Sequence, residues 1–130
     1  MTHFLQGKTI KSIKIADDKM ALLFVCCDGE HVARVDAECC SHSWIENIDV
    51  RVLSFPATVL SVDDIDIPEN GHLVAFYGLS IKTDRGEIEL DYRNESNGYY
   101  GGSISWPGEY FYGGVFEQNV SSQKWEDVPR

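Results

Sequence analysis

Apolar and charged residues alternate strictly along residues 87–93. Ile88, Leu90 and Tyr92 occupy every second position, and charged side chains occupy the positions between them. A period of two places the apolar residues on one face of a β-strand and the charged residues on the other face. The segment is therefore predicted to be a strand with one buried face, which requires a sheet around it.

Other short runs of β-branched and aromatic residues are separated by turn-forming clusters. Strands are predicted over residues 9–15, 20–27, 31–35, 57–62, 72–83 and 87–93, and turns at 28–29, 68–71 and 84–86. The first three runs predict a meander whose buried face forms half of the core. Two aromatic strand-and-turn units follow, at 99–102 and 111–114.

Residues 43–49 have the pattern of a short helix. Ser43 and Glu46 have the spacing of a capping box, and Trp44, Ile45 and Ile48 could form an inward stripe. The predicted fold is therefore an α+β domain dominated by β-structure. It has one antiparallel sheet or more, about six to eight strands in all, and one short helix near 43–49.

Length and composition predict a single domain over residues 1–130. The chain has 130 residues, of which 43% are hydrophobic, and this is enough for one core without disulfide or metal support. The tail from about residue 118 is polar and is expected to be ordered only where Trp125 packs. No apolar run approaches the ~20 residues that span a bilayer, and the amino terminus lacks a signal-peptide core. We therefore expect a cytoplasmic protein with no membrane contact.

The formal net charge is −10, with acidic residues in excess in each third of the chain. Nucleic-acid binders hold phosphates with Lys and Arg, so direct nucleic-acid binding is not expected. Such a chain favours basic partners. A homo-oligomer is compatible with the sequence.

The four cysteines form two adjacent pairs, Cys26-Cys27 and Cys39-Cys40. Zinc and free thiols are the two interpretations. Neighbouring side chains on extended backbone point to opposite faces, so only one sulfur of each pair could reach a common centre. Free thiols are favoured, and neither a metal nor a cofactor is predicted.

The sequence lacks the standard catalytic signatures of phosphate loops, zinc proteases and serine hydrolases. Cys40 and His42 are two apart, too far along a strand for a tight nucleophile–base hydrogen bond. His3, His31 and His72 are interpreted as surface or core residues. No catalytic residue is predicted, and an enzyme is the third choice.

An acidic stripe follows one face of the strand at 87–93. Its carboxylates, Glu87, Glu89 and Asp91, are spaced by roughly 6.5–7 Å. One interpretation is a solvated outer face; the other is an array resembling DNA phosphates that binds a basic protein. The candidate protein-binding residues are Asp63, Asp64, Asp66, Glu87, Glu89 and Asp91.

The stretch after the same strand combines an arginine, amide side chains, glycines and paired aromatic rings. Donors for phosphate and a platform for a base suit a nucleotide, whereas the alternative is a wide turn whose tyrosines cover the core. The candidate ligand-binding residues are Arg93, Asn94, Asn97, Tyr99 and Tyr100.

Two motifs resemble those of a known group of proteins: ECCSHSW at 38–44 and RNESNGYYGG at 93–102. Together they resemble an uncharacterised domain of small phage and prophage proteins, and the likeness covers about residues 7–102. In size and layout the chain is also similar to the Thoeris anti-defence proteins, which sequester a cyclic ADP-ribose signal without cleaving it. The only basic residues after Arg93 are Lys124 and Arg130, so the resemblance assigns no ligand residue.

The leading hypothesis is a phage-type accessory protein that counters host defence by sequestering a small nucleotide without catalysis. The alternative is an acidic inhibitor, similar to an anti-CRISPR protein or a DNA mimic, that blocks a basic surface of a host defence protein. The expected partner is accordingly a small nucleotide or a basic host protein.

Overall fold

A computed structural model describes residues 3–37, 42–50, 53–65, 74–95, 102–107, 110–111, 114–115 and 124–128. Its strands are β1 (Thr9–Ala16), β2 (Ala21–Cys26), β3 (Gly29–Ala37), β4 (His42–Asp49), β5 (Ala57–Ile65), β6 (Val74–Thr83), β7 (Gly86–Glu95), β8 (Gly102–Ser105), β9 (Tyr110–Phe111), β10 (Gly114–Val115) and β11 (Trp125–Asp127). Within these ranges, no helix is long and apolar enough to cross a membrane.

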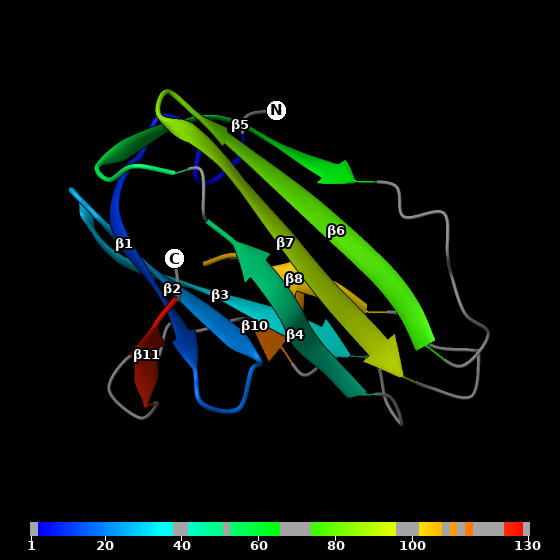
Figure 1. The fold of residues 1–130 in the computed structure, drawn as a ribbon. Coiled ribbons are helices and arrows are strands. Elements are labelled where there is room, and N and C mark those ends of the chain that lie inside the picture. Colours follow the sequence, from blue (N-terminus) through cyan, green and yellow to red (C-terminus); the bar gives the residue numbers. More distant parts are fainter. Residues whose placement is uncertain are drawn as a thin grey trace.

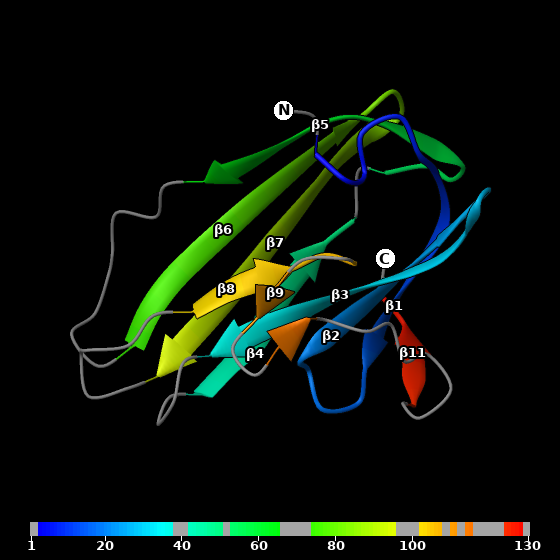
Figure 2. The ribbon, with the colours of Figure 1, turned by 180° about the vertical axis from the view of Figure 1, so that it is seen from behind.

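Eight strands follow one hydrogen-bonded path, β4-β7-β6-β5-β1-β2-β3-β8, and β11 adds to β1. The pairings along it are antiparallel, and β9 and β10 form a separate small ladder. Between β1 and β5 only Thr9 and Ile10 pair, with Thr58 and Ala57. The path bends at this short junction, so β4, β7, β6 and β5 form a front layer and β1, β2, β3 and β8 a back layer (Figures 1 and 2). The predicted antiparallel, β-dominated architecture is confirmed.

The main core lies between the two layers. Back-layer residues such as Ile13, Leu22 and Phe24 cluster there with front-layer residues such as Ile81 and Leu90. The predicted meander is confirmed, because β1, β2 and β3 pair in sequence and contribute one side of this core. Burying apolar surface at roughly 25 cal/mol per Å² makes this cluster the main source of stability.

The back layer carries a second apolar cluster on its other face. Ala16, Ala21, Leu23 and Val32 are buried there, and Trp125 of β11 packs against them. Alternation explains the split, because Leu22 and Leu23 are neighbours on β2 and point to opposite faces. The expected packing of Trp125 in the tail is confirmed.

The predicted helix at 43–49 is wrong, because these residues form β4 and the described residues contain no helix. The pairing register with β7 shifts between Ile45 and Asn47, which marks a β-bulge at Glu46. The extra residue brings Ile45 and Ile48, three apart in sequence, to the core side, while Trp44 pairs opposite the outward-facing Arg93. The bulge therefore imitates the i, i+3 spacing of a helix.

Two tight hairpins are present where the sequence predicts them. The second turn is Asp84-Arg85, within the predicted 84–86, whereas the first is Cys27-Asp28, one residue before the predicted 28–29. Each ends on a glycine with positive φ, 134° at Gly29 and 133° at Gly86, a region that other residues rarely adopt. Two strands continue further than predicted: β5 includes Asp63 and Asp64, and β7 continues to Glu95.

Candidate functional site

The outer face of the front layer has β7 near its centre. On this strand Ile88, Leu90 and Tyr92 are buried, whereas Glu89 is exposed and Glu87 and Asp91 are partly exposed. The predicted alternation is confirmed, and the acidic stripe lies on the outer side. Outward carboxylates thus line the strand at every second residue.

Strand register extends this stripe sideways. Asp49 of β4 pairs opposite Glu89, and Ser80 of β6 pairs opposite the same residue from the other side. Asp63 of β5 pairs opposite Ser80, so four neighbouring strands contribute to one surface. Neighbouring strands lie about 4.8 Å apart. Asp49 is therefore one strand away from Glu89, and Asp63 is two strands away with Ser80 between them.

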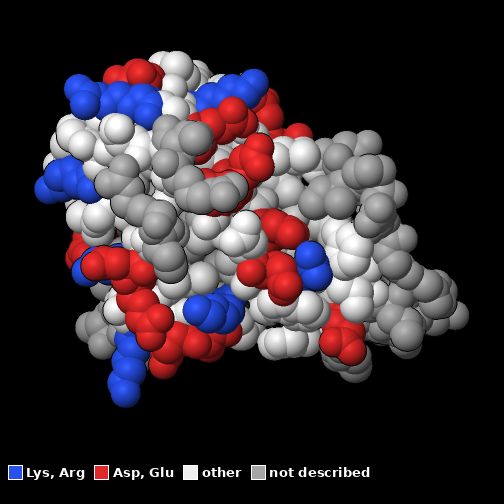
Figure 3. All heavy atoms as spheres, viewed as in Figure 1, with Lys and Arg blue, Asp and Glu red and all other residues white. Residues whose placement is uncertain are grey.

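We call this surface the acidic face. Its carboxylates are Glu46, Asp49, Asp63, Glu87, Glu89, Asp91 and Glu95, and the basic side chains among its described residues are Lys82 and Arg93. Figure 3 views this side of the molecule, where red carboxylates gather across the middle and most of the blue side chains lie toward the left. The face therefore has an excess of negative charge.

Arg93 lies among aromatic rings on the acidic face. Its guanidinium carbon is 4.6 Å from the centroid of the Phe76 ring on β6. On the other side it pairs opposite Trp44 of β4, whose ring stacks on His42 with the centroids 5.4 Å apart. A cation over an aromatic ring gains roughly 0.5–1 kcal/mol at an exposed site. We call Trp44, Phe76 and Arg93 the aromatic spot, because they present ring surfaces and one cation within the acidic face.

Two carboxylates neutralise this arginine. Arg93 Nη1 lies 3.6 Å from Glu46 Oε1, and Nη2 lies 3.4 Å from Asp91 Oδ2. Glu46 also accepts a hydrogen bond of 2.8 Å from Trp44 Nε1 through its other oxygen. Glu46 therefore connects the bulge of β4 to Trp44 and Arg93. The positive charge of Arg93 is already balanced by Glu46 and Asp91.

The predicted nucleotide residues are only partly brought together. Arg93 points outward, whereas Asn94 is 1% exposed and donates a hydrogen bond of 2.9 Å to Ser43 Oγ inside the protein. The two side chains therefore cannot contact one ligand on the same face of β7. Asn97, Tyr99 and Tyr100 lie outside the described residues.

The predicted acidic residues are also divided. Asp63, Glu87, Glu89 and Asp91 share the acidic face. Asp64 pairs opposite the buried Leu79, so it lies on the other side of β5, and Asp66 is outside the described residues.

The inner side of β7 near Asn94 is polar and aromatic. Tyr92 is 6% exposed and stacks on Tyr77 of β6 with ring centroids 5.2 Å apart. Burial, followed by the negative charge of Asp64, raises the pKa of Tyr92 to about 12. Tyr92 therefore stays protonated and packs as part of the core.

The sequence interpretation missed Trp44, Glu46 and Phe76 as members of the outer surface. The sequence predicts Trp44 on the inward stripe of a helix at 43–49 and Phe76 within a strand at 72–83, without assigning either to an outer face. Residues 42–45 alternate in the structure, with Ser43 and Ile45 buried and His42 and Trp44 on the outer side. The sequence hides this alternation, because the buried Ser43 is polar and the outer Trp44 is apolar.

The cysteine and histidine predictions are tested only in part. Cys26 is buried and its neighbour Cys27 is exposed, as expected for adjacent residues on a strand and its turn. His3 contacts the ring of Trp106 edge-on at 4.5 Å, and His31 pairs with Asp28. Cys39, Cys40 and His72 lie outside the described residues.

The described structure is that of a small, two-layered antiparallel β-protein with a carboxylate-rich face on one sheet. The chain belongs to the family described as Domain of unknown function (DUF7448), whose model matches residues 4–106. This confirms the expectation of an uncharacterised domain family. No curated protein and no solved structure matches the chain.

Proposed function

We propose that the protein acts by binding, and that the acidic face holds a basic surface of a partner protein. The observation that carries this proposal is the row of outward carboxylates on β7, Glu87, Glu89 and Asp91, which carboxylates of β4 and β5 extend on either side across one face of the front layer. An array of like charges of this kind steers a positively charged partner and fixes its orientation.

The aromatic spot gives such an interface an anchor. Binding energy in interfaces concentrates in a few aromatic and arginine residues surrounded by polar contacts. Trp44, Phe76 and Arg93 offer these residue types on the same face, beside Glu46 and Asp91. Charge would bring the partner in, and the ring surfaces would contribute contact area once water is excluded.

The resemblance to phage and prophage proteins supplies a biological setting. We infer that the partner is a host defence protein whose basic surface binds nucleic acid, and that the acidic face competes with that nucleic acid. Carboxylates about 7 Å apart along β7 offer a regular row of negative charge to such a surface. No catalytic step is part of this proposal.

Sequestration of a small nucleotide remains a second proposal. The partly exposed rings of Trp44 and Phe76 beside Arg93 favour it, because aromatic faces stack bases and a guanidinium binds phosphate. The acids that contact Arg93 oppose it, since an anion would have to displace Glu46 and Asp91. Calorimetry with cyclic and linear adenine nucleotides distinguishes the two proposals, because only sequestration predicts binding that Arg93→Ala weakens.

Affinity co-purification from a bacterium, followed by mass spectrometry, tests the main proposal. The tagged wild-type chain should enrich a basic protein, and the chain carrying Glu87→Lys, Glu89→Lys and Asp91→Lys should not. Equal recovery by both chains, or no partner with the wild type, would argue against the acidic face as the binding surface.

A further inference from the structure

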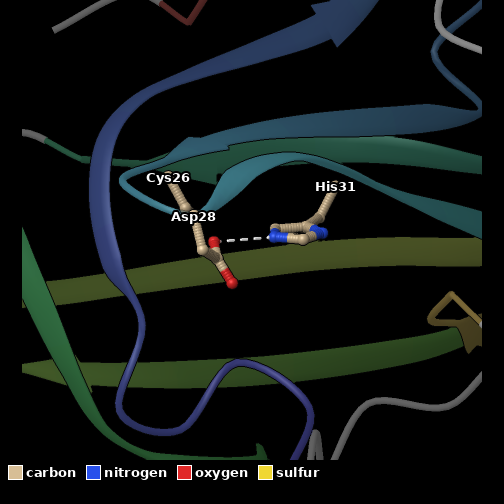
Figure 4. A group of neighbouring side chains, drawn as sticks. All are labelled: Cys26, Asp28 and His31. Carbon is tan, nitrogen blue, oxygen red and sulfur yellow. Dashed lines mark hydrogen bonds and ion pairs between the residues drawn. The ribbon is translucent and has the colours of Figure 1, made fainter.

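Three side chains of different chemistry converge at the β2–β3 hairpin, away from the acidic face. They are Cys26, the last residue of β2, Asp28 in the turn, and His31 on β3 (Figure 4). The Cys26 sulfur, a carboxylate oxygen of Asp28 and a ring nitrogen of His31 all lie within 4.8 Å of one another. They therefore form a compact set of one sulfur, one oxygen and one nitrogen donor.

Hairpin register explains the convergence. Cys26 pairs opposite Gly29, and His31 lies two residues further along β3, so both side chains point to the same face. Asp28 folds back from the turn, and its Oδ1 atom lies 2.9 Å from His31 Nε2. A ring contact with Phe4, edge-on at a centroid distance of 5.1 Å, fixes the imidazole plane.

We propose that Cys26, Asp28 and His31 bind a divalent transition metal ion of the zinc class, with solvent as the fourth ligand. Thiolate, imidazole and carboxylate are the donors that zinc takes in proteins, and three protein ligands with one open position are a common set. Calcium and magnesium do not fit, because both require oxygen ligands only. This site differs from a four-cysteine centre, since it uses one sulfur and leaves Cys27 in solvent.

The separations are close to those that a metal needs. Ligand atoms about 2.0–2.3 Å from a tetrahedral ion are roughly 3.3–3.6 Å apart. The Asp28–His31 pair is 2.9 Å apart and all three donor atoms lie within 4.8 Å of one another, so shifts on the order of 1 Å bring them onto one ion. Burial raises the pKa of the Cys26 thiol to about 11, and the metal would therefore displace a proton from it.

Lys8 is the internal competitor for this site. Its ammonium nitrogen lies 2.7 Å from Asp28 Oδ2 and 4.7 Å from the centroid of the Phe4 ring. A bound metal ion repels this ammonium group. Either Lys8 moves away from Asp28, or the metal ion and Lys8 contact the same carboxylate. Lys8→Met, which keeps the aliphatic stem, should consequently increase metal affinity, a result that no purely structural role of the hairpin predicts.

Titration of the full chain with Co²⁺, followed by absorption spectroscopy, tests the proposal, because cobalt reports thiolate ligands in the near ultraviolet. We expect one ion per chain, competed by Zn²⁺. His31→Gln and Asp28→Asn should each weaken binding at least about 10-fold, the lower end of what loss of even an outer partner costs. Cys26→Ser should abolish the thiolate band.

Matched controls separate this site from other thiols and histidines of the chain. Cys27→Ser, His42→Gln and the double change Cys39→Ser with Cys40→Ser should leave the affinity and the band unchanged. Circular dichroism of each variant checks its fold. Because Asp28 is exposed, the Asp28→Asn variant still tests the site if Cys26→Ser unfolds. The proposal would be overturned if adding Co²⁺ gave no absorption beyond that of Co²⁺ in buffer alone. It would also be overturned if the Cys39→Ser, Cys40→Ser chain lost Co²⁺ binding while His31→Gln kept it.

Discussion

Arg93 and Asn94 are consecutive in the chain, yet their side chains lie on opposite faces of β7. Arg93 contacts Phe76, Glu46 and Asp91 on the outer surface, whereas Asn94 hydrogen-bonds Ser43 in the interior. The two residues therefore have different physical roles: one shapes a surface, and the other joins β4 to β7.

This division gives a prediction about stability. Asn94→Ala removes a buried hydrogen bond and should lower the free energy of unfolding by about 1–3 kcal/mol. Arg93→Ala removes a partly exposed cation and should lower it by no more than about 1 kcal/mol. Urea denaturation of both variants measures the difference, and equal losses would contradict the assignment of the two faces.

The strand at 42–49 makes a second prediction, because a helix would place Trp44 inside. Ile45 is 3% exposed and belongs to the main core, so Ile45→Ala should cost about 2–5 kcal/mol. Trp44→Ala, on the outer side, should cost about 1 kcal/mol or less. Thermal denaturation compares them, and the reverse order would restore the helix.

The raised pKa of Tyr92 should make the folded protein less stable at alkaline pH. Its folded pKa of about 12 lies above the ordinary value of 10.0, so between these values the unfolded chain loses a proton that the folded chain keeps. The free energy of unfolding should therefore fall as pH rises from 10 to 12, by roughly 2 kcal/mol for this residue. Tyr92→Phe should remove this part of the loss.

The comparison between wild type and Tyr92→Phe isolates the effect. The Cys26 thiol, whose pKa is also raised, titrates in both chains and cancels in the difference. Denaturation curves at pH 9, 10, 11 and 12 provide the measurement. Parallel curves for the two chains would mean that Tyr92 is not buried as described.

Much of the fold follows from local sequence signals. The alternation around Leu90 identified β7 and its two faces, and the turn ending at Gly29 identified the β2–β3 hairpin, because both signals depend only on neighbouring residues. The bend between β1 and β5 was beyond such signals, since it results from a two-residue pairing between distant segments.

The candidate sites were less predictable for related reasons. At β4 a bulge placed Ile45 and Ile48 on one side and imitated helical spacing. At the hairpin the spacing of the cysteines gives no sign that Asp28 and His31 place polar atoms within 4.8 Å of the Cys26 sulfur. At β4 the extra residue of the bulge decides which side chains face the core. At the hairpin the turn between Cys26 and Gly29 decides which side chains lie close to Cys26.

Binding of a basic protein by the acidic face can be measured on the partner identified by co-purification. Calorimetry would compare wild type, the reversal of Glu87, Glu89 and Asp91 to lysine, and a matched reversal of the exposed Asp17, Glu126 and Asp127 away from this face. All three chains should keep their thermal midpoints close together, and the two reversed chains carry the same net charge.

The acidic-face reversal should lower the affinity at least 100-fold, about 2.7 kcal/mol, while the matched reversal should change it only slightly. Wild-type affinity should also fall as salt rises from about 0.05 to 0.5 M, because the attraction is screened. Equal losses in the two reversed chains would show that net charge alone matters. Unchanged binding by the acidic-face reversal would contradict the claim outright.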